Sequence, residues 1–100
     1  MTDYRALLAY WTERLELSDR EVSLEMVPQK GIPGCDMEVC FLDREAMRWL
    51  IKIRRGRIQD AETVLVHELL HVRTGLLDAR DEKNLWVLAR ALVGLKYAKA

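Results

Sequence analysis

The chain contains only two histidines, and both lie in one short pattern, His67-Glu68-Leu69-Leu70-His71. Residues four apart lie one turn apart on the same face of a helix, so both imidazoles can point at one metal ion. The glutamate between them is rotated by about 100° around the helix axis, where it can reach a water held by that metal. The pattern therefore predicts a Zn2+ site with His67 and His71 as ligands and Glu68 as general base.

The surroundings of the pattern are those of a buried helix. Asp60 can cap its start, Glu62 adds a negative charge where the helix dipole favours one, and Gly75 can end it in a left-handed conformation. The alternative is a helix that carries two unrelated histidines, because any short pattern has false positives. The apolar residues on both sides of the pattern favour the metal site.

A catalytic zinc site needs a third protein ligand, and here it must be a carboxylate or a thiolate because no third histidine exists. Asp78, Asp81 and Glu82 follow the Gly75 turn at the start of a last helix that would fold back on the motif helix. Glu82 is preferred, because the apolar residues Trp86, Ala89 and Val93 continue its side of that helix. Asp81 has a similar continuation, and all three carboxylates could simply favour the helix dipole.

The two cysteines, Cys35 and Cys40, are expected to be reduced and structural. Their spacing of five within a predicted strand places them on opposite faces, which disfavours a shared metal or a disulfide.

Periodicity along the chain predicts an α+β fold made of one domain, residues 1–100. Helical spacing of apolar residues indicates a first helix, and alternation indicates strands separated by a loop rich in proline and glycine. The predicted order is a helix over Tyr4–Leu15, strands over Glu21–Val27, Met37–Phe41 and Met47–Arg54, and helices over Asp60–Gly75 and Ala79–Tyr97.

Charge and hydropathy bear on the class of protein. Sixteen basic residues balance sixteen acidic ones, which argues against a nucleic-acid binder. That class stays as a lesser alternative because Lys52, Arg54, Arg55 and Arg57 could form a basic patch. There is no apolar run of membrane-spanning length and no signal-peptide pattern, so we expect a soluble cytoplasmic protein without a membrane partner.

The phrase Val66-His67-Glu68-Leu69-Leu70-His71-Val72, followed by Asp81-Glu82 and Leu88-Ala89-Arg90-Ala91-Leu92, resembles the minimal gluzincins and phage-type zinc metallopeptidases. More distantly, the chain is similar to the repressor-cleaving ImmA/IrrE-type domains. The resemblance implies a zincin-like fold, with a small twisted sheet of two to three or more strands on the motif helix. It also implies that His67, His71 and Glu82 hold zinc while Glu68 is the base. One departure is Trp86, which stands where larger gluzincins carry an aspartate that supports a histidine.

The predicted activity is hydrolysis of a peptide bond in a specific protein substrate. We expect the substrate to lie extended along an edge strand, and Met47–Arg54 is the predicted edge. Donors for the developing oxyanion are sought among Tyr10, Arg73, Arg80 and Tyr97. The alternative is a non-catalytic, zincin-like binding module; the sequence leaves the oligomeric state open.

Overall fold

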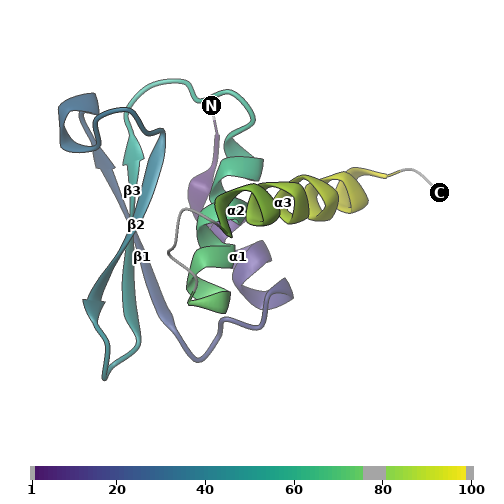
Figure 1. Ribbon diagram of the computed structural model, residues 1–100, viewed down its shortest axis with the longest axis horizontal. Coiled ribbons are helices and arrows are strands. Elements are labelled where there is room, and N and C mark those ends of the chain that lie inside the picture. The colour runs from purple at the N-terminus through teal and green to yellow at the C-terminus, as the bar shows by residue number, and fades with distance from the viewer. Residues whose placement is uncertain (1, 76–80, 99–100) are drawn as a thin grey trace.

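The computed structural model describes residues 2–75 and 81–98. In this part of the chain the fold is α+β, as predicted, with three helices and a three-stranded mixed sheet (Figure 1). A 3-10 turn, Gln29–Gly31, lies in the predicted loop. The elements in chain order are α1 (Tyr4–Arg14), β1 (Glu21–Val27), β2 (Met37–Asp43), β3 (Arg48–Arg54), α2 (Ala61–Thr74) and α3 (Glu82–Tyr97).

The strands pair in the order β1-β3-β2, so β3 is the central strand. It pairs parallel to β1 and antiparallel to β2. The prediction that Met47–Arg54 is an edge strand was therefore wrong. Alternation of apolar residues reports which face of a strand is buried, and it is the same for a central and an edge strand. Within the described sheet the edges are β1 and β2.

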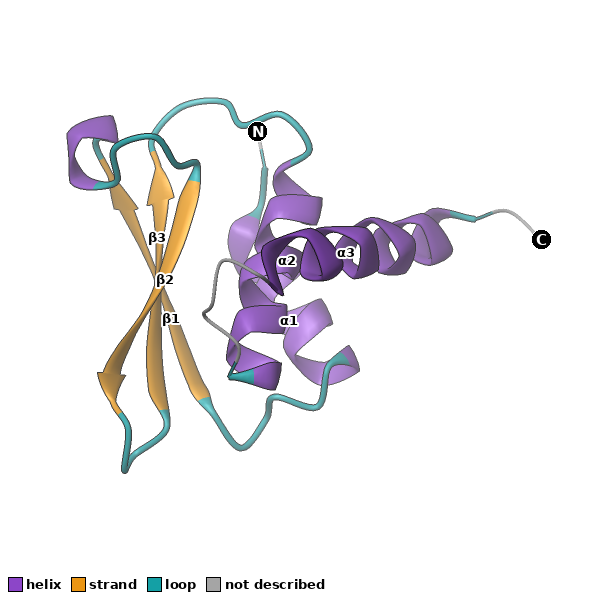
Figure 2. Ribbon diagram, in the orientation of Figure 1, coloured by secondary structure: helices purple, strands orange, loops and turns teal. Residues whose placement is uncertain are grey.

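One face of the sheet is apolar and packs on the helices. The pairing register places side chains of all three strands together on this face, and the β3 residues among them, Trp49, Ile51 and Ile53, are buried as their alternation predicted. In Figure 2 the sheet forms one layer, and α1 and α2 lie together on one side of it. The core lies between these two layers.

Helix α2 is the centre of the molecule, with its residues from Val64 to Val72 all buried. Gly75 ends it with a left-handed φ of 71°, as the sequence predicted. The expected side-chain cap at its start is absent, and that prediction was wrong. Asp60 takes a left-handed conformation (φ 53°, ψ 43°) instead of the extended one that a capping side chain requires, and its carbonyl accepts the Val64 N–H.

Helix α3 crosses α2 and extends away from the sheet (Figure 1). It spans Glu82–Tyr97, so its predicted end is confirmed, whereas the predicted start at Ala79 lies outside the described residues. Its last turn is fixed by Glu62 of α2, which accepts hydrogen bonds from Lys96 Nζ (2.7 Å), from Tyr97 Oη and, on the other side, from Trp11 Nε1 of α1 (2.7 Å). Glu62 thus joins the three helices.

No helix in residues 2–75 or 81–98 has both the length and the apolar character needed to cross a membrane.

Candidate metal centre

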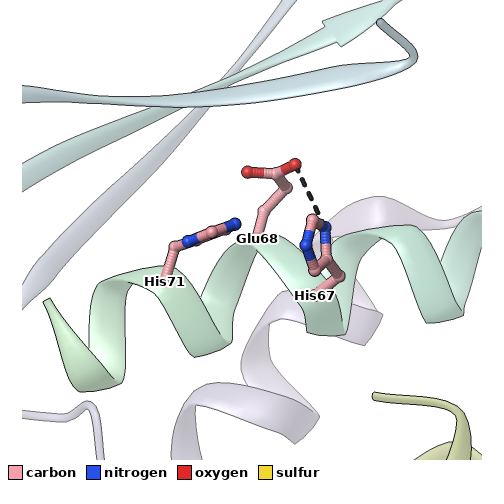
Figure 3. A group of neighbouring side chains, drawn as sticks. All are labelled: His67, Glu68 and His71. Atoms are coloured by element: carbon pink, nitrogen blue, oxygen red, sulfur yellow. Dashed lines mark ion pairs between the residues drawn. The ribbon is translucent and has the colours of Figure 1, made fainter. Parts of the chain in front are cut away.

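The three motif residues project from one side of α2 beneath the sheet (Figure 3). His67 and His71 are each 3% exposed and Glu68 is 7% exposed. One nitrogen or oxygen from each of the three lies within 4.8 Å of the others, close enough for these residues to hold one metal ion. Such burial of three ionisable side chains is costly unless they bind a partner.

Glu82, at the start of α3, approaches both histidines. Its Oε1 lies 2.7 Å from His71 Nε2, and its Oε2 lies 2.9 Å from His67 Nε2. Among the described residues, Glu82 lines the cleft beside the motif and its neighbour Asp81 does not. The geometry therefore favours Glu82 over Asp81, whereas Asp78 lies outside the described residues.

His67 provides the test of whether these residues fit a metal. Both of its ring nitrogens are buried, and neither makes a hydrogen bond with the residues that the structure describes. Glu82 lies close to His67 Nε2, but this contact lacks the geometry of a hydrogen bond. The contact from His67 Nδ1 to Glu68 Oε1 is too long for one, at 3.5 Å (dashed in Figure 3). A buried imidazole nitrogen without a partner is costly, and coordination of a metal would satisfy it. The donor set of two imidazoles and one carboxylate suits zinc.

Trp86 also belongs to this centre. Its indole stacks on the His67 imidazole with ring centroids 4.0 Å apart and planes 11° from parallel. The sequence placed Trp86 on the same side of α3 as Glu82, because the two are four residues apart, but it gave no sign of the stacking. The partner of that side chain lies on another helix, so nothing local in the sequence reports it.

A cleft of about 520 Å³ opens beside the motif. One wall is the segment from Gly34 to Val39, and the other is formed by α2 and the start of α3. Five consecutive residues of β2 and the turn before it, Cys35 to Val39, line the cleft. Side chains alternate between the faces of a strand, so a continuous lining means that the backbone edge of β2 borders the cleft.

The unpaired backbone groups of β2 can be assigned from the pairing. The Arg54 amide donates to the Asp36 carbonyl at 2.9 Å, so Asp36 and Arg54 form a hydrogen-bonded pair. Bonded and non-bonded pairs alternate along antiparallel strands. Met37 and Val39, whose partners are Ile53 and Ile51, therefore direct their N–H and C=O groups away from β3, toward the open edge.

Cys35 lies on the rim of the cleft, outside β2 and exposed, and neither it nor Cys40 forms a disulfide. The prediction that both cysteines lie in one strand was wrong, because Cys35 precedes β2. Both thiols are free, in line with the spacing that disfavoured a disulfide. Although the residue is largely exposed, partial desolvation of its sulfur and then the nearby carboxylates of Glu38 and Glu68 raise the pKa of the Cys35 thiol.

Three of the four candidate oxyanion donors lie away from the cleft. Among the described residues that line the cleft, Tyr10, Arg73 and Tyr97 are absent. Tyr97 donates to Glu62 at the far end of α3, and Tyr10 packs edge-on against Trp11. Arg80 lies outside the described residues.

Comparisons with protein-family models, with curated proteins and with solved structures find no significant match to this chain.

Proposed function

We propose that this chain is a zinc-dependent peptidase of zincin-like fold. The observation that carries the proposal is the approach of the Glu82 carboxylate to Nε2 of both His67 and His71 from a second helix. Two histidines on one helix and a carboxylate on the next are three donors of the kind that catalytic zinc sites use.

In this proposal His67, His71 and Glu82 hold the metal. A bound zinc supplies Lewis-acid polarisation of the scissile carbonyl and of the attacking water. The chain itself provides the base, Glu68. Its contact with His67 Nδ1 is too long for a hydrogen bond, so the carboxylate is available to take a proton from water and pass it to the leaving amine.

The substrate would bind as an extended peptide along β2. Val39 and Met37 direct backbone donors and acceptors to that open edge, and a peptide can pair with them as an added strand. Because the cleft is small, we propose a specific protein substrate rather than general protein breakdown, acting in the cytoplasm.

Elemental analysis and a hydrolysis assay on the same protein samples test the proposal. We expect about one zinc per chain in the wild type and in Glu68→Gln, and a loss of zinc in His71→Ala. Cleavage of a mixed peptide library, followed by mass spectrometry, should occur with the wild type and not with Glu68→Gln. Zinc that is retained unchanged in His71→Ala would rule out the assigned ligands.

The non-catalytic binding module is distinguished by the same assay. It predicts that zinc is structural or absent and that the wild type and Glu68→Gln are equally inactive toward every peptide.

The nucleic-acid alternative receives less support from the basic segment. Arg54 donates from Nε to Asp36 Oδ1 at 3.1 Å, and its other guanidinium nitrogens donate to the carbonyls of Arg55 and Arg57. This guanidinium is engaged with its own chain. DNA binding that weakens steeply with salt would nevertheless favour that alternative.

A further inference from the structure

We propose that Trp86 is the positioning residue of this metal centre, because its indole holds the His67 imidazole in the plane from which that ring can bind the metal. The inference rests on the proposed zinc site, and it assigns a role to a residue that would not itself touch the metal.

The need for such a residue comes from His67. A histidine that binds a metal usually donates its second ring N–H to a carboxylate or a carbonyl, which fixes the orientation of the ring. Neither nitrogen of His67 makes such a bond within the described chain. Hydrogen bonds therefore do not restrict the rotation of this ring about χ2, its last side-chain torsion.

Stacking on Trp86 provides the missing restraint. With planes 11° from parallel and centroids 4.0 Å apart, the indole covers one face of the imidazole. Rotation of the ring by a large angle would drive its edge into the indole. The stack leaves the ring in one plane, and the edge of the ring that carries Nε2 faces Glu82.

Helix α3 carries both the proposed ligand, Glu82, and the stacking residue, Trp86. Glu82 and Trp86 are four residues apart on α3, so they lie one above the other on one face. Glu82 reaches the Nε2 atoms of both histidines, while Trp86 covers the flat face of His67. The guanidinium of Arg90, another four residues on, lies 5.7 Å from the Trp86 ring centroid. Packing of α3 on α2 therefore both places Glu82 and orients the His67 ring.

The first measurement is made on the metal-free wild-type chain and needs no substitution. An indole stacked at this distance shifts the His67 ring protons upfield in the NMR spectrum, and the His71 protons should serve as an internal comparison. Loss of this shift in Trp86→Leu identifies its source. Absence of the shift in the wild type would overturn the proposal.

The second measurement is zinc affinity, obtained by competition with a chromophoric chelator. We expect Trp86→Leu to lower the affinity by about 10- to 100-fold, the usual cost of losing a residue that supports a metal-binding histidine. Trp86→Phe should recover most of the affinity, because a phenyl ring can also stack.

Trp49→Leu is the matched control, because it removes an indole that packs on Phe41 in the sheet. It should reduce stability without changing zinc affinity. Equal losses of affinity in Trp86→Leu and Trp49→Leu would overturn the proposal, as would an unchanged affinity in a folded Trp86→Leu. If the wild type binds zinc but cleaves no peptide, the proposed function is wrong. The zinc affinities of the variants would still test the role of Trp86.

Discussion

Asp81 and Glu82 are adjacent carboxylates at the start of α3, and Glu82 is the one that approaches both motif histidines. We predict that Glu82→Gln lowers zinc affinity by more than the roughly 10- to 100-fold expected for a supporting residue, because an amide is a weaker ligand than a carboxylate. Asp81→Asn should leave the affinity unchanged. Isothermal titration of both variants checks this, and a stronger effect of Asp81→Asn would reassign the ligand.

Cys35 provides a second prediction at the scale of a residue. Cys35 lies at the exposed rim of the cleft, whereas His67 and His71 are buried and are approached by Glu82, so we expect Cys35 to take no part in the metal site. Cys35→Ser is therefore expected to retain the zinc content of the wild type. Measurement of zinc per chain after dialysis tests this, and a fall in zinc would show that the thiolate takes part.

The sequence predicted the part of the site whose geometry is local. His67, Glu68 and His71 come together because helical spacing alone sets their directions. The sequence favoured Glu82 over Asp81 through the apolar residues that follow it on the same side of the helix, but it could not decide between them. The choice depends on how α3 docks on α2, because one residue changes the direction of a side chain by about 100°. The stacking of Trp86 on His67 was missed for the same reason.

The elements themselves were largely predictable. The bounds of β1 matched, and α2 was found within one residue of its end because Gly75 marks it. The order of the strands was not predictable, because alternation identifies the buried face and carries no information about the neighbours in the sheet. The assignment of β3 as the edge strand was therefore wrong. The edge strand that borders the cleft is β2.

The open edge of β2 leads to a prediction about peptide binding. Val39→Pro removes an N–H that points away from β3, so it should abolish an added-strand contact while leaving the sheet paired. We expect peptide cleavage to fall at least tenfold, the effect of losing about 1.4 kcal/mol of binding, with zinc content unchanged. Steady-state kinetics on a cleaved peptide measures this.

Met26→Pro is the control for that experiment. In β1 the Glu21 amide and the Val27 carbonyl bond toward β3, so Met26 directs its N–H to the opposite edge of the sheet, and its side chain is exposed. Cleavage should stay near the wild-type rate. An equal loss in both proline variants would mean that strain in the sheet, and not the β2 edge, causes the effect.

At the scale of the whole molecule, Glu62 is the charge that connects the helices. Burial alone would raise its pKa, but the hydrogen bonds from Lys96, Tyr97 and Trp11 outweigh burial and lower it. The pKa of Lys96 is raised, first by its hydrogen bond to Glu62. The stabilisation from Glu62 is thus complete above its ordinary pKa of 4.5 and is lost as pH falls below it. That from Lys96 is complete below 10.5 and is lost as pH rises beyond its raised value.

We predict that Glu62→Gln lowers the free energy of unfolding by about 1.5–3 kcal/mol at pH 7, the usual range for hydrogen bonds to a charged group. The difference from the wild type should shrink as pH falls below 4.5. Urea unfolding in the presence of a chelator, at pH 7 and at pH 3, measures both values. Glu21→Gln breaks the exposed pair with Arg48 and should cost no more than about 1 kcal/mol. A Glu62→Gln difference that is the same at both pH values would contradict the prediction.

Glu62 has a consequence for the metal site at the other end of α3. Fourteen residues of helix, roughly 21 Å at 1.5 Å per residue, separate Lys96 from Glu82. Anchoring the last turn restricts the motion of α3 relative to α2. Glu82 is thereby held near the two histidines at a high effective concentration. In the proposed zinc site, the chelate effect would therefore depend partly on Glu62, a carboxylate that lies far from the metal ligands, and weakening that anchor should speed the release of zinc.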